Sequence, residues 1–586
     1  MVCISGWVSI DTNHPVLPHH HTLRMSILDW LVLMSTLVFI TVYGIYKSRG
    51  SRNIEGYLLG DKSMPWFAIG LSIMATQASA ITFLSAPGQA FTDGMRFLQF
   101  YFGLPLAMIV LSVTVVPIFH KLKIYTAYEY LESRFDYKTR ALGALLFLIQ
   151  RGLAAGLTIY APAIILSSLL GWNIYWTNIF IGGIVVVYTV AGGTKAVSYT
   201  QLGQMAIIFS GIILAAVLIF QMLPDISLHE VITVAGKTGK MNLVDLSFEA
   251  DSKYNIWSGL IGGFFLALAY FGTDQSQVGR YLGGKSITES RLGLLFNGLV
   301  KIPMQLFILF IGALLYVFYI FQPQPVFFNK VETEKVMNSP YAERFNDVQM
   351  AFDENREKKE AVTLGMIQAI RNGDDHQANV MADSLKQFNN TSEDLRKEAK
   401  AVLKSSDANA DTNDTNYIFL RFVIDHLPEG IIGLLIAVIF AASMSSTSSE
   451  LNALASTSVV DIYKRSWATG KSEQHYLSAS KWLTVLWGVY AIMVAQFANQ
   501  LGSLIEAVNV LGSLFYGTIL GIFLTGFYVK RVKGTAVFMA AVVAEAAVIA
   551  CYIFTDISFL WYNLVGCLLV IALGLTLSMF KTTSEK

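Results

Sequence analysis

The chain alternates long apolar runs with short polar connections, a pattern that predicts thirteen helices crossing a membrane. A helix needs about 20 consecutive apolar residues to cross the hydrocarbon core of a bilayer. The predicted spans are 26–47, 65–91, 97–119, 140–169, 174–191, 197–222, 256–275, 291–322, 418–447, 477–499, 504–529, 535–554 and 559–580. We therefore expect an all-α, polytopic membrane protein.

Lysine and arginine gather on every second connection, which predicts how the chain is oriented. Cytoplasmic connections of membrane proteins carry an excess of these two residues. The basic connections fall at 47–62, 121–140, 195, 280–291, 464–471 and 530–533, with Lys581 in the tail. The pattern predicts a multi-pass protein of the cell membrane (plasma or inner), with its N-terminus outside and its C-terminus in the cytoplasm.

Two longer polar segments interrupt the apolar pattern. Residues 223–255 are expected to hold short amphipathic helices, and residues 323–417 form a helix-prone insertion of mixed charge. Such charge density predicts an extracytoplasmic segment, which could be a lid, a partner-binding module or passive decoration; decoration is favoured. The insertion separates a first transmembrane block, 25–322, from a second one, 418–586, and an N-terminal extension without predicted structure (1–24) precedes both.

Composition excludes several functions. The chain of 586 residues is 54% hydrophobic and 14% charged, and its net charge of +1 implies no nucleic-acid partner. Cys3, Cys551 and Cys567 are too few and too scattered for a disulfide framework or a thiolate metal site. No phosphate-binding glycine loop or catalytic triad is evident, so we expect no enzyme, no ATP-driven pump and no organic cofactor. The residues before Met25 lack the apolar run of a signal peptide, and we expect Met25 to be the natural start.

The run AASMSSTSSELNALA at 441–455 places five serines and a threonine within seven residues of an apolar segment. At helical spacing, Ala442, Ser445, Ser446 and Ser449 share one stripe. A main-chain carbonyl and hydroxyl oxygens on that stripe could replace the water around a small hard cation. The alternative is a seam of small residues that lets a neighbouring helix approach closely.

A second span, 65–91, is also rich in hydroxyl groups and ends with Pro87 and Gly88. Such a helix can unwind at the centre of the membrane and expose carbonyls to an ion, as discontinuous helices of secondary transporters do. Irregular backbone is tolerated at that depth only where it lines a cavity. The alternative is a flexible helix that stays intact.

Five motifs occur in order along the chain: GYLLGDKSMPWFAIGLSIMAT, TAYEYLESRF, YTVAGGTKAV, TDQSQVGRYL and SSTSSELNALASTSVVDIY. Together they resemble the sodium/solute symporter family, which includes carriers for glucose, iodide, proline, sialic acid, biotin and monocarboxylates. The resemblance covers about residues 26–580, apart from the insertion. It implies the leucine-transporter-type fold, a 5+5 inverted repeat at 65–222 and 256–529, with one helix before the repeats and two after.

The resemblance also implies a main sodium site made of five neutral oxygens. The first core helix would offer the carbonyls of Ala75 and Ala78. The eighth would offer the carbonyl of Ala442 and the hydroxyls of Ser445 and Ser446. This set coincides with the serine stripe described above, so we expect sodium as the coupling ion and no other metal.

Part of the family has a second sodium site, which uses an aspartate of the fifth core helix and two serines. Ser448 and Ser449 match those serines, but Gln201 stands where the family often has the aspartate. An amide supplies an oxygen without a charge, so we expect only one sodium ion.

The solute is expected at the centre of the membrane between the broken helices. The candidate binding residues are Gln77, Thr82, Gln99, Tyr270, Phe271 and Lys301. Tyr270 and Phe271 stand where the family's sugar carriers stack an aromatic ring, and Lys301 matches a lysine of their site. Lys301 could instead be a structural partner of Asp274. The acidic residue of those carriers is replaced by Gln99, so the solute stays open among sugars, organic anions and vitamins.

Two further ionisable residues fall within predicted spans. Arg151 is expected either to line the pathway or to pair with a carbonyl, and Glu545 to face a protein contact. A charge inside a membrane is costly and usually functional.

The expected function is a sodium-coupled symporter that imports a small polar solute by alternating access, with sodium, the solute and the lipid bilayer as its partners. A proton-coupled symporter of the same fold is the first alternative, since Lys301 or Glu545 could titrate. A membrane sensor built on a transporter scaffold is the second, with the insertion as its signalling part.

Overall fold

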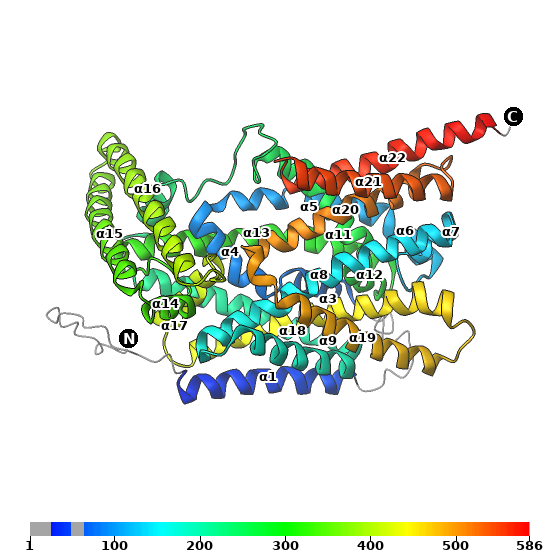
Figure 1. The fold of residues 1–586 in the computed structure, drawn as a ribbon, viewed down its shortest axis with the longest axis horizontal. Helices are drawn as coiled ribbons and strands as arrows, with labels where there is room; N and C mark the ends of the chain where they lie inside the picture. The colour runs from blue at the N-terminus through cyan, green and yellow to red at the C-terminus, as the bar shows by residue number, and fades with distance from the viewer. Residues whose placement is uncertain (1–24, 49–63, 585–586) are drawn as a thin grey trace.

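The structure, a computed structural model, describes residues 25–48 and 64–584. The expected N-terminal extension, 1–24, and most of the first basic connection, 47–62, lie outside the described residues. Within the described part, the long helices run side by side in one bundle, with α1 on one flank and α21 and α22 on the other (Figure 1). The fold is therefore helical, as predicted.

The helices of the bundle agree with the thirteen predicted spans. Among the described residues, nine helices are long and apolar enough to cross a membrane, one bent pair forms a further span, and three apolar helices are shorter. The bundle consists of α1 (Ile27–Ser48), α3 (Trp66–Gln77), α4 (Ala80–Asp93), η2 (Met95–Tyr101), α5 (Leu104–Val113), α6 (Val115–Leu122), α8 (Tyr137–Leu170), α9 (Ile174–Gln221), η3 (Ser258–Gly262), α11 (Gly263–Thr273), α12 (Gln275–Leu282), α13 (Ile287–Phe321), α18 (Ile431–Thr457), η5 (Ser458–Trp467), α19 (Glu473–Ala495), α20 (Leu504–Tyr528), α21 (Gly534–Phe554) and α22 (Phe559–Ser584).

The second span is broken at its middle. Helices α3 and α4 meet at an angle of 61°. Between them, Ala78 (φ −85°, ψ 69°) and Ser79 (φ −73°, ψ 174°) leave the helical conformation. The predicted unwinding at the centre of the membrane is therefore present. A corresponding break separates α11 from α12 at Asp274 (φ −78°, ψ 118°), whose carboxylate accepts a hydrogen bond from the Ser276 amide at 2.9 Å.

The eighth core helix differs from the predicted span 418–447. Residues 418–426 form a separate short helix, α17 (Ile418–His426), and the membrane helix α18 starts only at Ile431. The break contains Pro428 and Gly430, and Gly430 has a positive φ of 84° that favours glycine. The serine run therefore lies in the middle of α18 rather than at the end of a span.

Asp29 of α1 holds the new start of α18. Its carboxylate accepts hydrogen bonds from the amides of Gly430 (2.6 Å) and Gly433 (2.9 Å). These amides belong to the first turn, where backbone donors lack partners within the helix. A buried carboxylate therefore fixes the helix that carries the serines.

Two predicted spans, 174–191 and 197–222, belong to the single element α9. Ile181 shares a cavity wall with Phe440 of α18, and Gly211 lies close to the Leu435 side chain of the same helix. A straight helix of 48 residues would be about 72 Å long. Its two halves could not then reach neighbouring turns of α18. The chain therefore turns back within α9 and crosses the bundle twice.

The insertion consists of α14 (Lys330–Met337) and a hairpin of two long helices, α15 (Ala342–Arg371) and α16 (Asp375–Ser406). It has its own small apolar core, which includes Phe345, Phe352 and Leu403. The hairpin projects from one end of the bundle, and the C-terminal end of α22 lies at the opposite end (Figure 1).

Candidate functional site

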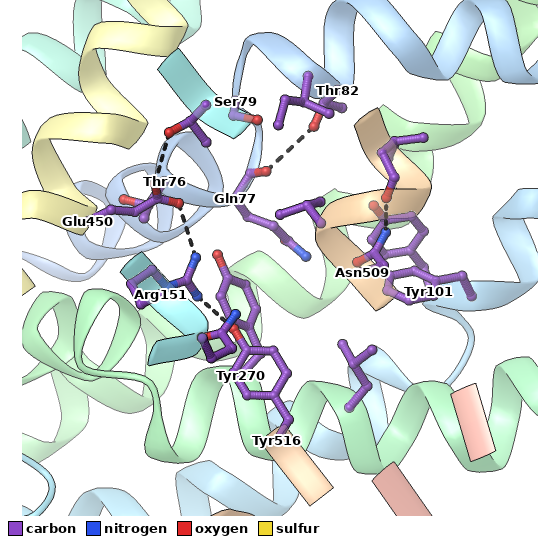
Figure 2. Close-up of a pocket in the computed structure, with 17 residues that line it drawn as sticks. Thr76, Gln77, Ser79, Thr82, Tyr101, Arg151, Tyr270, Glu450, Asn509 and Tyr516 are labelled. Atoms are coloured by element: carbon purple, nitrogen blue, oxygen red, sulfur yellow. Dashed lines mark hydrogen bonds and ion pairs between the residues drawn. The ribbon is translucent and has the colours of Figure 1, made fainter. Parts of the chain in front are cut away.

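A central cavity of about 80 Å³ opens beside the break between α3 and α4 (Figure 2). Its wall combines hydroxyl, amide, aromatic and charged groups from six parts of the bundle. The lining residues are Thr76, Gln77, Ser79, Ile81, Thr82, Phe100, Tyr101, Gln150, Arg151, Thr158, Leu266, Tyr270, Glu450, Ile505, Val508, Asn509 and Tyr516. Such a mixture of polar and aromatic groups is typical of a small-molecule site.

Several polar groups of this wall are free to bind a solute. The side-chain oxygens of Gln77 and Gln150 are buried and have no hydrogen-bond partner. The Thr82 hydroxyl donates a long hydrogen bond of 3.5 Å to the Gln77 carbonyl. An unpartnered buried oxygen costs free energy, so a hydrogen-bond donor of the solute would bind favourably to these oxygens.

The cavity also contains a compact ionic cluster (Figure 2). The Arg151 guanidinium donates to Glu450 at 3.0 Å, forms an ion pair with Asp274, and donates to the Tyr516 hydroxyl at 2.6 Å. Tyr516 in turn donates to Asp274 at 2.8 Å, and Arg151 lies 5.3 Å from the centre of the Tyr270 ring. One buried cation thus faces two buried carboxylates, which leaves no positive charge in excess.

This cluster decides two open expectations. The alternative for Arg151 was a carbonyl partner, yet its partners are the carboxylates of Asp274 and Glu450. Asp274, the alternative partner expected for Lys301, is instead held by Arg151. Lys301 is fully buried, its ammonium has no hydrogen-bond partner, and it lies 5.5 Å from the centre of the Tyr101 ring.

Three of the six predicted solute-binding residues line the cavity, namely Gln77, Thr82 and Tyr270. Lys301, Phe271 and Gln99 are buried outside its wall. The Gln99 amide donates to the Tyr254 carbonyl at 3.0 Å and accepts from the Asp245 amide at 3.0 Å. Gln99 therefore holds the polar segment 223–255 against η2 in this structure.

The serine stripe of α18 meets the break of α3 beside this cavity. The Ser446 hydroxyl donates to the Ala75 carbonyl at 3.2 Å, and both residues are buried. The Ser445 hydroxyl is buried without a partner. Two hydroxyls and a carbonyl near an unwound backbone are the neutral oxygens that an alkali cation needs, and the donor set fits sodium.

Gln201 of α9 occupies the space behind the stripe. Its side-chain oxygen accepts from the Ser72 hydroxyl at 2.6 Å, and its nitrogen lies 3.2 Å from the Thr76 hydroxyl and 3.4 Å from the Ser449 hydroxyl. The Ser448 hydroxyl is buried and has no partner. The amide therefore connects α3, α9 and α18 through neutral hydrogen bonds.

The family assignment rests on a family model described as "Sodium:solute symporter family", which matches residues 57–340 and 395–544. The chain belongs to this family. It is therefore a multi-pass sodium-coupled symporter of a small solute, and not an enzyme.

Several curated proteins are similar to this symporter. The sodium/sialic acid symporter NanT of Aliivibrio fischeri is 26% identical over 572 residues, with 94% of each chain covered. The human sodium/iodide cotransporter is 32% identical over 269 residues, which cover 46% of this chain and 41% of that one. The mouse sodium-coupled monocarboxylate transporter 1 is 26% identical over 86% of this chain and 69% of that protein.

A solved structure shares the fold. It is described as a substrate-bound outward-open state of a Na⁺-coupled sialic acid symporter, and it matches with a TM-score of 0.73 and 23% identity. The match covers 95% of this chain and 98% of that one. The likeness supports the predicted architecture of the symporter.

Glu450, Tyr516 and Asn509 of the symporter's cavity were not among the predicted site residues. Glu450 could have been found, because a lone carboxylate directly after the serine run is rare inside a membrane helix. It accepts hydrogen bonds from Arg151 and, at 2.9 Å, from the Thr158 hydroxyl. Tyr516 and Asn509 give no comparable local signal, since isolated tyrosines and asparagines occur throughout the spans.

Proposed function

We propose that this symporter imports an uncharged, hydroxyl-rich solute of the sugar class together with one sodium ion. The observation that carries the proposal is the contact of Ser446 with the Ala75 carbonyl at the helix break. Gln77 and Thr82, on either side of the same break, line the cavity. Sodium and solute would thus act on the same few residues of α3 and α4. Their binding would be coupled because each ligand stabilises the same arrangement of that break.

The sodium ion would be held by the carbonyls of Ala75, Ala78 and Ala442 and the hydroxyls of Ser445 and Ser446. The Ser446 hydroxyl now donates to Ala75; with sodium bound, it would turn its oxygen toward the ion, as would the carbonyl. Neutral oxygens can replace the ion's hydration and still release it on the other side of the membrane. Closing α18 onto α3 around the ion would fix the wall of the solute cavity.

A single sodium ion is proposed because Gln201 carries no charge. Its amide already has partners on Ser72, Thr76 and Ser449. A second cation beside Ser448 and Ser449 would have to displace these hydrogen bonds and be desolvated without a neighbouring carboxylate.

The solute class follows from the hydrogen-bonding groups of the cavity and from the pairing of its charges. Free amide oxygens and hydroxyls, such as those of Gln77 and Thr82, suit a solute with several hydroxyl groups, and Tyr270 offers a ring face to a sugar. The positive charge of Arg151 is matched by Glu450 and Asp274, so a carboxylate on the solute would have to compete with both. Sialic acid, carried by NanT, shares the hydroxyl-rich part of this chemistry.

The proposed orientation has the N-terminus outside and the C-terminus in the cytoplasm, in the plasma or inner membrane. It is supported by the basic connections and by the position of the insertion at the end of the bundle opposite the C-terminus (Figure 1). The insertion would then lie outside the cell.

The test is a thermal-shift screen of the purified chain followed by uptake into proteoliposomes. Neutral hexoses, sialic acid, monocarboxylates and iodide are compared in sodium and in potassium buffer at fixed pH. We expect a sodium-dependent shift and uptake for a neutral sugar. Preference for an anion would contradict the proposed solute class, and uptake driven by a pH gradient without sodium would support proton coupling instead.

A further inference from the structure

A second cavity, of about 310 Å³, lies between the insertion and the body of the transporter. Its wall is formed by the end of α4, the end of α13, Lys240 of the polar segment after α9, and the facing sides of α15 and α16. It shares no lining residue with the central cavity. The transport mechanism described above makes no use of it.

The charge of this wall is unbalanced. Lys240, Lys359, Arg396, Lys397 and Lys400 line it, against only two carboxylates, Asp93 and Glu393. Three of these cations have an ion-pair partner beside the wall, Lys397 with Asp394 and both Arg396 and Lys400 with Asp414. Lys240 and Lys359 have no ion pair among the described residues.

Two ammonium groups of this cavity share one aromatic ring. Lys240 lies 5.0 Å and Lys359 lies 5.6 Å from the centre of the Tyr316 ring. Lys240 also donates to the Thr92 carbonyl at the end of α4. Lys359 is only 6% exposed, and no hydrogen bond or ion pair satisfies its ammonium group.

Burial lowers the pKa of both lysines to about 8, and for Lys359 the positive charge of Lys240 contributes to that shift. Two like charges so close together in a partly buried site repel each other. When both lysines are protonated, a negative charge close to them would offset this repulsion.

Arg396 of α16 provides a further free donor. One of its terminal nitrogens donates to both oxygens of Asp414, at 2.7 Å each. The other, Nη1, is buried without a partner. A guanidinium with one nitrogen fixed and the other free is well suited to bind an oxyanion.

We propose that this cavity binds a small doubly charged oxyanion, a phosphate or a dicarboxylate, between Lys240, Lys359 and Arg396. The bound anion would connect α15 and α16 of the insertion to the end of α4, the outer half of the broken helix. Residues 341–394 lie outside the ranges that the family model matches, so α15 and much of α16 are additional to the part that the model describes. The insertion would thereby supply a ligand site separate from the transport site.

The experiment is isothermal titration calorimetry of the purified full chain with sodium phosphate and, separately, sodium succinate, at pH 7.5 and constant sodium. We expect at least one dianion to bind with a Kd below about 1 mM, corresponding to about 4 kcal/mol. Lys359→Met should weaken that binding at least tenfold. Lys386→Met, which changes an exposed α16 lysine paired with Asp383, should leave it unchanged.

Thermal stability supplies an independent readout. The dianion should raise the Tm of the wild type but not of Lys359→Met, and without dianion the variant should melt no lower than the wild type because a repelling charge is gone. Absence of binding by both dianions, or equal binding by Lys359→Met, would overturn the proposal. Sodium-dependent uptake without dianion should persist in Lys359→Met, so failure here is distinct from failure of the proposed transport function.

The pH dependence sharpens the test. The charged groups that act on Lys240 and Lys359, besides each other, are Asp93 of α4, Arg96 of η2, and Glu393 and Arg396 of α16. Succinate stays doubly charged between pH 7 and pH 9.5, whereas both lysines lose their protons as the pH rises through about 8. Succinate affinity should therefore fall across that range, and a flat profile would exclude the lysines as the binding groups.

Discussion

The two cavities solve the problem of a buried cation in opposite ways. In the central cavity, Arg151 is enclosed by Asp274, Glu450 and Tyr516, and every charge has a partner within the protein. In the cavity beside the insertion, called the outer cavity below, Lys359 contacts the ring of Tyr316, is repelled by Lys240 and Arg396, and is attracted by Glu393 without forming an ion pair. A cluster whose cation is fully paired can hold a helix break together while an uncharged solute binds and leaves, whereas cations without an ion-pair partner would be paired by an anion from solution.

The largest difference between the two cavities is expected when the cation of each is removed. Arg151→Met should leave Asp274 and Glu450 buried without a counter-charge, which costs about 3–5 kcal/mol. We expect a large fall in Tm and no sodium-dependent uptake. The equivalent change in the outer cavity, Lys359→Met, should not lower the Tm, because it removes a repulsion.

Melting of the purified proteins in detergent measures both effects. Adding Asp274→Asn and Glu450→Gln to Arg151→Met should recover much of the lost Tm, since the unpaired charges are then gone. If Arg151→Met melts like the wild type, or if Lys359→Met is the more damaging change, the contrast between the cavities is wrong.

The second prediction concerns the sodium site at the edge of the central cavity. Ser446→Ala removes one hydroxyl oxygen next to the Ala75 carbonyl. The sodium concentration for half-maximal uptake should rise about tenfold or more, which corresponds to about 1.4 kcal/mol. Uptake in proteoliposomes at varied sodium and constant ionic strength measures it.

Ser456→Ala is the matched control, because this buried serine of α18 uses its hydroxyl only for the Ala453 carbonyl of its own helix. Its sodium dependence should match the wild type. An unchanged sodium dependence in Ser445→Ala, Ser446→Ala and the double variant would remove these residues from the site.

How far the sequence predicts this molecule depends on the distance over which each feature is encoded. The break between α3 and α4 and the serine stripe are local patterns, so the span and its unwinding could be expected from the residues themselves. The meeting of Ser446 with α3 was expected only because the family resemblance implies it. The start of α18 was misjudged, although Pro428 and Gly430 are in the sequence, because an apolar run precedes them.

The ionic cluster could not be predicted in the same way. Arg151 finds Asp274 and Glu450 at separations of 123 and 299 residues, and no periodicity links such positions. The outer cavity was equally hidden. Lys359 lies in the run ENREKKEAV, whose charges read as an exposed helix face; only the packing of α15 over Tyr316 buries this one lysine.

The third prediction concerns Gln201, the neutral group behind the serine stripe. Gln201→Asp would place a carboxylate beside Ser448 and Ser449, where an uncharged amide now donates to Ser449 at 3.4 Å. We expect the variant to gain a second sodium ion and a steeper sodium dependence of uptake. Reversal potentials in proteoliposomes give the coupling ratio, expected near one for the wild type and near two for the variant.

Gln201→Asn is the control, because it keeps the amide but shortens it. It should not raise the coupling ratio. A ratio near two in the wild type would mean that neutral oxygens suffice for the second ion and that the interpretation of Gln201 is wrong.

The smallest effect on transport is expected from removing the outer cavity altogether. Replacing residues 330–412 by a short Gly/Ser linker deletes Lys359, Arg396 and the apolar core of the insertion around Phe345 and Phe352. The central cavity and the sodium site share no residue with the deleted segment, so sodium-coupled uptake should stay within about threefold of the wild type. Dianion binding, in contrast, should disappear, because two of its three proposed donors are gone. Uptake and calorimetry on the same preparation, with size-exclusion chromatography to show intact folding, separate these results.

Loss of uptake in a well-folded deletion variant would show that the insertion takes part in transport itself, and retained dianion binding would place the anion elsewhere.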